Sequence, residues 1–481
     1  MSSTHSRPAG RSGAWRLDPD RCFSPDPSVR ARARELYAVV RDLPIVSPHG
    51  HVQPELLADP DARFSDPAQL LIVPDHYVFR MLYSQGVRLE DLGVPTRDGT
   101  PVETDPRAIW RRFCSHFHLF AGTPTGLWLK SELVELFGID VKPSAETADA
   151  LFDHIDAQLA LPEFTPRALF ERFDIELLAT TDAATDDLAA HDAARADGLP
   201  VVPTFRPDAL MALNDPSWRE RLELLGARVG SEVTDLAGFL SALRTRREYF
   251  RARGATASDH GVFSPFVEPL NAAEAERLFA RALAGTADTA DADRFHSHLL
   301  FELAGMACDD GLVMQLHVGS RRNHNQAVYE RFGLDKGADI PVAVDWTRGL
   351  HTLLNAYGND PRFHLITYTL DEATYARELA PMAGHYPAMR LGAPWWFFDS
   401  VLGFERYLDR VVETAGIYNL AGFNDDTRAF PSIKTRHDVW RRTVSSWVAG
   451  MVERGLMDED AGLESAEWLA YGAAKAAYRL A

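Results

Sequence analysis

The sequence predicts an α/β protein whose core is a (β/α)8 TIM barrel. From residue 174 onwards, short apolar runs alternate with helical stretches, and most of the runs end in polar residues. Strands that alternate with helices form a parallel sheet, and eight such strands are typical of a barrel whose active site lies at their carboxyl ends. The expected strands are 44–51, 175–182, 201–206, 255–260, 312–317, 364–369, 389–394 and 418–426.

The first expected strand, PIVSPHGH, ends in two histidines, His49 and His51. Residues two apart in an extended chain point to the same side, so both imidazoles can face one point in space. Imidazole together with carboxylate suits Zn²⁺ or a similar transition ion. We therefore expect one divalent metal ion, with Zn²⁺ as its identity, at the end of this strand.

A helical insertion is expected after the first strand, over about residues 55–170, where several stretches have helical periodicity. Residues 29–481 are expected to form a single barrel domain that carries this insertion. Residues 1–28 are rich in Ser, Pro, Arg and Gly and predict a flexible N-terminal tail. Two amphipathic helices, over 434–454 and 461–480, are expected to follow the last strand.

Composition restricts the class of partner. The chain of 481 residues has a formal net charge of −19, which disfavours nucleic acid as a partner because the phosphate backbone is itself anionic. The sequence has no run of 18 apolar residues, so a membrane span is not expected. It also lacks the apolar stretch near residue 1 that is typical of a signal peptide. The three scattered cysteines predict a reducing, cytoplasmic location. We expect a small-molecule substrate and a homo-oligomer.

Two further His-x-His pairs, His116/His118 and His296/His298, lie in stretches with helical periodicity. On a helix, residues two apart diverge by about 200°, so such a pair is badly placed to share a metal ion. These four histidines are expected to be packing or surface residues.

The residue types and their spacing do not decide which residue is the third metal ligand. Asp425 and Asp426 end the eighth expected strand and point to opposite sides, but the sequence does not fix which side faces inward. His317, at the end of the fifth strand, is either a further ligand or a substrate contact.

Several motifs narrow the interpretation. They are Asp75-His76-Tyr77 with Arg80, Thr204–Asp208 (TFRPD), Met314–Gly319 (MQLHVG) with Arg322 and Asn323, Leu391–Phe397 (LGAPWWF), Asp426–Phe430 (DTRAF), and Thr435–His437 with Arg441 and Arg442. Their order, over about residues 30 to 455, resembles that of the uronate isomerase (glucuronate isomerase) family. That family belongs to the amidohydrolase superfamily, which has the barrel of the metal-dependent hydrolase type.

The resemblance implies roles for individual residues. It implies that the metal ligands are His49, His51 and Asp426, and that Asp426 also acts as the catalytic base. The further residues implied to contact the substrate are His76, Tyr77 and Arg428. Three positions depart from the family pattern, which usually has Asp at position 47, a longer side chain than Gly at position 50 and Thr at position 425.

The chemistry of that family explains the residue types. Isomerisation of a hexuronate, such as D-glucuronate to D-fructuronate or D-galacturonate to D-tagaturonate, moves a proton from C2 to C1 through an enediol. The C2–H bond becomes acidic when a metal, Tyr77 or Arg428 polarises the adjacent carbonyl, and a carboxylate can then carry the proton. Arginine recognises the substrate carboxylate with two hydrogen bonds, which Arg206 and Arg428 could supply. Trp395 either stacks on the sugar or packs in the core.

Two alternatives stay open at this point. A mononuclear metal-dependent hydrolase or decarboxylase of the same superfamily would use the same barrel and would activate a water. The absence of a lysine at the ends of the eight expected strands argues against a binuclear version. A non-catalytic sugar-acid binding protein is the other alternative.

Overall fold

The structure is a computed structural model that describes residues 14–480. Of the expected tail over 1–28, residues 1–13 lie outside the described residues. Residues 14–26 precede helix α1 (Pro27–Val40) and pack on the rest of the chain. The backbone N–H of Trp15 donates to the carbonyl of Asp140 at 2.6 Å, and the guanidinium of Arg21 pairs with Asp438 at 2.8 Å.

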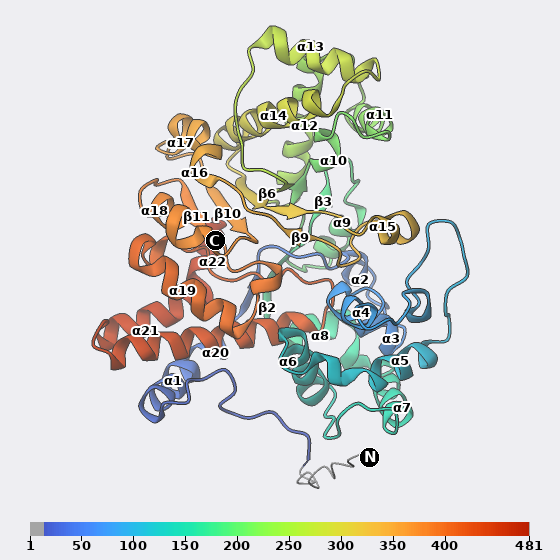
Figure 1. Ribbon diagram of the computed structural model, residues 1–481, viewed down its shortest axis with the longest axis vertical. Coiled ribbons are helices and arrows are strands. Elements are labelled where there is room, and N and C mark those ends of the chain that lie inside the picture. The colour runs from blue at the N-terminus through green and yellow to red at the C-terminus, as the bar shows by residue number, and fades with distance from the viewer. Residues whose placement is uncertain (1–13, 481) are drawn as a thin grey trace, which may run out of the picture.

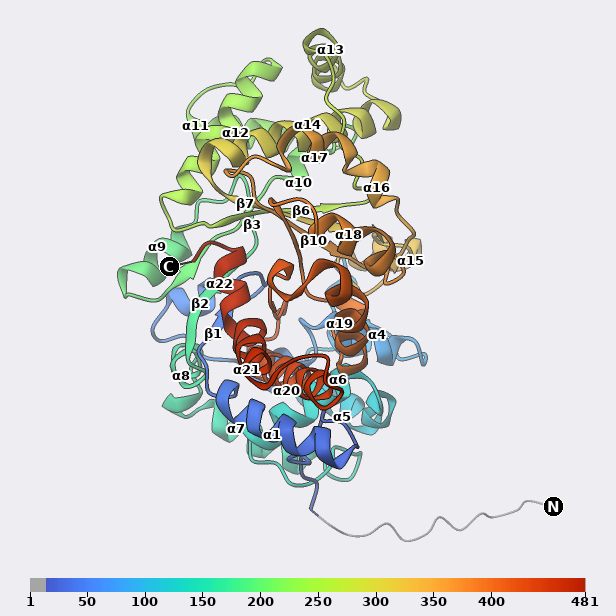
Figure 2. The same ribbon diagram turned by 90° about the vertical axis from the view of Figure 1, so that its left-hand side faces the viewer.

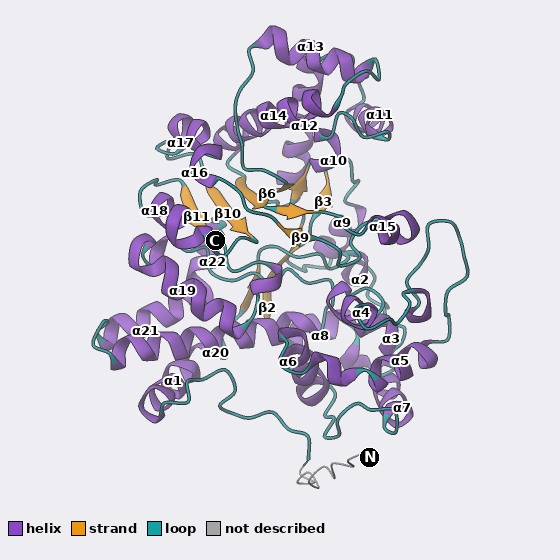
Figure 3. Cartoon of the chain, viewed as in Figure 1, coloured by secondary structure: helices purple, strands orange, loops and turns teal. Residues whose placement is uncertain are grey.

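Parallel strands form the centre of the molecule (Figures 1 and 3). One sheet has the order β1-β2-β4 and the other the order β11-β10-β7-β6-β5-β3. The bounds are β1 Ile45–Ser47, β2 Ile175–Ala179, β3 Asp182–Ala183, β4 Val201–Val202, β5 Phe205–Arg206, β6 Ala257–Val262, β7 Val313–Val318, β10 Leu365–Thr369 and β11 Met389–Leu391. A small antiparallel pair, β8 (Ser320–Arg321) and β9 (Ile340–Pro341), lies beside them.

The pairing follows the order of the chain, as in a (β/α)8 barrel. The second and third expected strands are each broken in two, so that β2 pairs with β4 and β3 pairs with β5. The α/β fold predicted for the sequence is confirmed by its parallel strands and the helices between them, whose arrangement is TIM-barrel-like.

The prediction of an eighth regular strand over residues 418–426 was wrong. This segment contributes only one isolated bridge, between Leu420 and Leu391 of β11. Residues 421–427 are irregular. The N–H of His51 donates to the carbonyl of Thr427 at 3.0 Å, so the loop after β1 lies beside the end of this segment.

Helices cover the strands, as Figure 2 shows from a second side. Between β1 and β2 lie α2 Glu55–Ala58, α3 Pro67–Leu71, α4 His76–Tyr83, α5 Pro106–Ser115, α6 Pro124–Ser131, α7 Ala148–Leu159 and α8 Pro166–Arg172. The later helices include α9 Ala189–Ala196, α10 Asp208–Met211, α11 Trp218–Val229, α12 Leu236–Arg251, α13 Ala272–Leu283, α14 Thr289–Asp310, α15 Gln326–Phe332, α16 Trp346–Gly349, α17 His351–Tyr357, α18 Ala380–Ala383, α19 Val401–Ala415, α20 Ser432–Glu453, α21 Glu459–Glu467 and α22 Ala473–Ala477. Over residues 14–480, no helix is both long and apolar enough to cross a membrane.

Apolar side chains gather in two clusters. One fills the space between the central strands and α10 to α20, and includes fully buried Phe205, Leu316 and Leu391. The other joins the helices between β1 and β2 to the strands themselves, and includes Trp110 and Leu178. Burial of apolar side chains is the main favourable contribution to folding, so the two clusters fix the helices that carry site residues relative to the strands.

Helix α20 anchors the first strand. It packs along α1, and its Arg441 donates to the carbonyl oxygens of Arg41 and Pro44 at 3.0 and 2.8 Å. Buried backbone carbonyls need such partners, because an unpaired one costs free energy. The start of β1, and with it the loop that carries His49 and His51, is therefore held by α20.

Candidate active site

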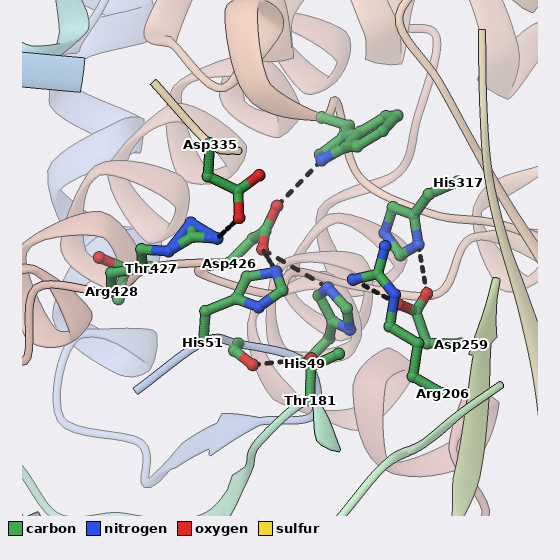
Figure 4. A network of polar contacts seen from close by, with 12 residues as sticks. His49, His51, Thr181, Arg206, Asp259, His317, Asp335, Asp426, Thr427 and Arg428 are labelled. Carbon is green, nitrogen blue, oxygen red and sulfur yellow. Dashed lines mark hydrogen bonds and ion pairs between the residues drawn. The ribbon is translucent and has the colours of Figure 1, made fainter. Parts of the chain in front are cut away.

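His49 and His51 lie in the loop directly after β1, not in the strand as expected. The loop is held at both sides, because the hydroxyl of Thr181 donates to the carbonyl of Gly50 at 2.9 Å and the N–H of His51 bonds Thr427. The Nε2 atoms of His49 and His51 lie 3.4 and 3.2 Å from Oδ1 of Asp426 (Figure 4).

The two aspartates of this segment face different neighbours. Asp426 turns toward the histidine pair, whereas Asp425 lies behind it and accepts a hydrogen bond from Nε2 of His437 at 3.1 Å. The backbone of Asp426 has a φ of 41°, in the left-handed region that non-glycine residues rarely adopt. Such backbone strain clusters at functional sites, where the surroundings enforce it.

The three side chains fit a metal ion. Potential ligand atoms of His49, His51 and Asp426 all lie within 4.8 Å of one another. Oδ1 of Asp426 is buried and accepts no hydrogen bond from the described residues, although a buried carboxylate oxygen normally finds a donor. Two imidazoles and one carboxylate form a donor set suited to Zn²⁺ and similar ions.

The other oxygen of Asp426 is already engaged. Nε1 of Trp395 donates to Oδ2 at 2.9 Å, and the indole also lies edge-on to the imidazole of His317, with ring centroids 4.8 Å apart. The two oxygens of Asp426 therefore face different partners, which fixes the carboxylate plane.

Beside this cluster lies a second pair of titratable groups. His317 and Asp259 share a hydrogen bond of 2.6 Å between Nδ1 and Oδ1, and Nε2 of His317 is buried with no partner among the described residues. Arg206 contacts the other oxygen of Asp259 at 3.4 Å and donates to Asp208 at 2.8 Å. His49, Asp259 and His317 also form a group close enough to hold a metal ion, so His49 is shared by both groups.

Helix α4 brings the next two predicted residues. Asp75 caps its first turn by accepting from the N–H of Tyr77 at 2.8 Å, a contact that places His76 and Tyr77 at the start of the helix. Their rings stack with centroids 4.7 Å apart, and the edge of His76 faces Trp396. The guanidinium of Arg436 lies 5.6 Å from the ring centroid of Tyr77.

A cavity of about 340 Å³, here called the inner cavity, joins these elements. It presents three arginines, and each is paired with a carboxylate: Arg206 with Asp208, Arg322 with Asp339 at 2.8 Å, and Arg428 with Asp335 at 2.9 Å. In Figure 4, Arg428 and Asp335 lie on one side of Asp426, and Arg206, Asp259 and His317 lie on the other. The lining is His51, His76, Tyr77, Arg206, Gly261, Arg322, Asn323, Leu334, Asp335, Trp395, Trp396, Asp426 and Arg428.

Burial and charge set the protonation states. Burial opposes ionisation of Asp426, but the two imidazoles more than offset it and hold the pKa of this carboxyl well below its usual range. Burial lowers the pKa of His51 to about 4 and that of His76 to about 3, so both are neutral at pH 7. Burial raises the pKa of Tyr77, which keeps its proton.

Most of the chain matches one family model. That model is described as glucuronate isomerase, and it matches residues 28–476. The chain belongs to the glucuronate isomerase family.

Relatives of the family agree over nearly the full length. A uronate isomerase of Nostoc punctiforme is 55% identical, covering 96% of this chain and 98% of the relative, and one of Rhizobium meliloti is 52% identical, covering 96% and 99%. The crystal structure of a glucuronate isomerase from Caulobacter crescentus superposes with a TM-score of 0.95 at 47% identity, covering 97% of this chain and 98% of that chain.

The predicted site residues of this glucuronate isomerase family member meet around one point. His51, His76, Tyr77, Arg206, Trp395, Asp426 and Arg428 line the inner cavity. His49 lies beneath it against Asp426, and His317 stacks on His49 with ring centroids 4.6 Å apart. Their individual roles stay predictions.

Sequence reasoning missed other residues of the site. Asp259 lay within the expected strand 255–260, and a search for acids at strand ends would have found it. Arg322 lay within a quoted motif but received no role. Asp335 sits in a loop, and nothing in its spacing connects it to Arg428.

The two rival His-x-His pairs take no part. His296 and His298 lie on α14, as expected. His116 ends α5 and His118 lies in the short 3-10 helix Phe117–Phe120. Neither pair belongs to a group of possible metal ligands among the described residues.

Proposed function

We propose that this chain is a uronate isomerase that interconverts the aldose and ketose forms of a hexuronate, with one Zn²⁺ ion held by His49, His51 and Asp426. The observation that carries the proposal is the environment of Asp426. One of its oxygens faces the imidazoles of His49 and His51 and the other faces Trp395, at the wall of a cavity that also presents Tyr77 and Arg428.

The metal supplies one kind of chemistry when bound, the polarisation of a substrate oxygen as a Lewis acid. The three ligands come from two segments at opposite ends of the chain, the loop after β1 and the segment before α20. The Thr181 and Thr427 bonds already hold the histidine loop, so the imidazoles need little reorganisation to bind an ion.

We assign the proton transfer to Asp426. Its carboxylate is ionised at neutral pH and can take the proton from C2 and return it to C1, through an enediol. Tyr77, which keeps its proton, can donate a hydrogen bond to the oxygen on which negative charge develops. General acid–base catalysis of this kind contributes about 10²–10⁴-fold.

Recognition of the substrate carboxylate falls to an arginine. Arg206 contacts two carboxylates, those of Asp208 and Asp259, whereas Arg428 contacts one, that of Asp335. Arg428 therefore keeps more N–H donors for a bidentate contact, and we assign it this role ahead of Arg206. His76, His317 and Trp395 are left to contact the sugar hydroxyls.

A uronate panel tests the proposal. Purified protein with Zn²⁺ is expected to convert D-glucuronate, D-galacturonate or both into the ketose acid, followed by proton NMR. In D2O, deuterium is expected at C1 of the ketose product whenever the proton carried by Asp426 exchanges with solvent before it is returned. No turnover of any member of the panel, with metal bound, would contradict the proposal.

Three further predictions accompany the activity. Metal analysis is expected to find one Zn²⁺ per chain. The three cysteines Cys22, Cys114 and Cys308 are free, which supports a cytoplasmic location. A homo-oligomer is expected, and light scattering checks it.

A further inference from the structure

A second cavity of about 340 Å³, here called the outer cavity, shares a wall with the inner cavity. His51 and Arg428 line both. The rest of its lining comes from the loop and helices that follow the histidine pair and from the segment after Arg428. Nothing in the reaction described above uses it.

The polar lining of the outer cavity contains no carboxylate. Its further polar side chains are Gln53, Arg63, Ser65 and Gln69. The side chains of Gln53, Ser65 and Gln69 make no hydrogen bond to any residue that the structure describes, so their donors are available to a ligand. The inner cavity differs, because Asp335 and Asp426 line it.

Arg63 also differs from the arginines of the inner cavity. Each of those has a carboxylate within 4.0 Å, whereas no carboxylate of residues 14–480 lies that close to the guanidinium of Arg63. Its only side-chain hydrogen bond to a described residue is a donation to the carbonyl of the adjacent Ala62 at 3.1 Å. Asp59 and Asp61 belong to the same loop, but neither lines the cavity. An arginine with free donors is suited to bind a carboxylate in bidentate fashion.

The floor of the outer cavity is apolar. Phe64 and Phe430 pack against each other with ring centroids 6.1 Å apart, and both are buried. Leu56 and Leu70 complete this surface. An apolar floor beneath a few polar groups is typical of small-molecule sites. Arg63 itself is exposed, so an incoming anion can reach its guanidinium.

From this lining we propose that the outer cavity is a second anion-binding site, which holds an incoming hexuronate by its carboxylate, through Arg63, before the sugar reaches the inner cavity. The proposal rests on the proposed function for the identity of the anion. Its benefit follows from the net charge of −19, which repels an anionic substrate from the molecule as a whole. A local free arginine next to the site counters that repulsion.

The replacement Arg63→Gln tests the proposal, with Arg244→Gln as the matched control. Arg244 is exposed on α12, has no carboxylate within 4.0 Å among the described residues, and its replacement changes the net charge equally. We expect R63Q to lower kcat/KM for D-glucuronate about tenfold through KM, with kcat unchanged, because a charge-assisted hydrogen bond is lost before chemistry. R244Q is expected to match the unaltered protein.

Salt and a second variant separate charge from structure. The fall of kcat/KM with added NaCl is expected to be shallower in R63Q than in R244Q. Gln69→Glu, which places a carboxylate of nearly the same shape on the cavity wall, is expected to raise KM in the same way. An unchanged KM in both R63Q and Q69E, or a fall in kcat without a rise in KM, would overturn the proposal.

Binding of D-gluconate, an acid that lacks the carbonyl needed for isomerisation, tests the site without turnover. Calorimetry is expected to show about tenfold weaker binding to R63Q than to R244Q. If no uronate is turned over but gluconate binding still depends on Arg63, the proposed function fails and the anion site stands. If uronates are turned over but Arg63 affects neither gluconate binding nor KM, the anion site fails alone.

Discussion

Asp426 is constrained from three directions at once. Its backbone has a φ of 41°, one carboxylate oxygen accepts from Trp395, and the other faces the histidine pair. A base that carries a proton between two adjacent carbons must stay within hydrogen-bond reach of both, so a fixed carboxylate is an advantage.

The exchange of this carboxylate for an amide is the sharpest test at the scale of a residue. Asp426→Asn is expected to lower kcat by about 10²–10⁴-fold, because the amide cannot accept the C2 proton. It is also expected to weaken Zn²⁺ binding. Steady-state kinetics and metal analysis measure the two effects.

Asp425→Asn is the matched control. The amide introduced by this replacement would keep an oxygen to accept the bond from His437, and the side chain of Asp425 faces away from the cavity. The kcat of the control is expected to stay within a few fold of the unaltered protein. Equal losses in the two variants would mean that Asp426 acts through structure alone.

Much of the site could be read from the sequence because its residues lie at fixed places in short motifs. His49 and His51 were identified from their spacing, and the family resemblance selected Asp426 over Asp425. Asp335 could not be found in this way, since its contact with Arg428 joins two loops and depends on tertiary packing alone.

At the scale of elements, the helices between β1 and β2 are tied to α20 by a buried acid. Glu132 begins a π-helical turn, Glu132–Leu136, and its carboxyl accepts from the hydroxyl of Ser432 at 2.5 Å. Only 2% of Glu132 is exposed, and burial raises the pKa of its carboxyl to about 8. The folded protein therefore holds a proton there at neutral pH.

Glu132 makes stability depend on pH in a defined direction. Its pKa is near 4.5 in an unfolded chain and about 8 when folded, so between these values the folded state binds more protons. Stability from this group is therefore lost as pH rises from about 5 to 8. Glu132→Gln mimics the protonated form and does not titrate. Between pH 5 and pH 8, the free energy of unfolding of this variant is therefore expected to rise relative to that of the unaltered protein, by on the order of 4 kcal/mol.

Urea unfolding at the two pH values measures this difference. Glu135→Gln is the control, because Glu135 lies on the same turn but its side chain is 47% exposed and pairs with Arg21. The control is expected to follow the pH dependence of the unaltered protein. The same pH dependence in Glu132→Gln would contradict the assignment.

The elements show why part of the fold escaped the sequence. Long buried strands such as β7, with all six residues buried, were placed to within a residue. The eighth segment was not, because residues 421–427 are irregular and only Leu420 bridges to a neighbouring strand. The backbone of Asp426, with its φ of 41°, departs from strand geometry. An apolar run bounded by polar residues does not distinguish these two cases.

For the whole molecule, the proposed metal ion would add a bond between two segments that are far apart in the sequence. The loop after β1 and the segment before α20 share one described backbone bond, between His51 and Thr427. Chelation with EDTA is expected to abolish activity and lower the melting temperature, and added Zn²⁺ is expected to restore both. Binding at a hundred times Kd stabilises a folded protein by about 2.7 kcal/mol.

Calorimetric melting with and without Zn²⁺ measures the stabilisation. Asp426→Asn is expected to respond much less to added Zn²⁺, since it lacks one ligand. An identical melting temperature before and after chelation, with metal loss verified, would show that the ion does not join the two segments.

The position of these ligands along the chain has a consequence for biosynthesis. His49 and His51 leave the ribosome early, whereas Asp426 emerges near the end of translation. Because a complete ligand set arises only on folding, the nascent chain offers the two imidazoles without Asp426 for most of its synthesis. Metal loading would then be one of the last steps in making this protein, and products truncated before residue 426 would be unable to complete it.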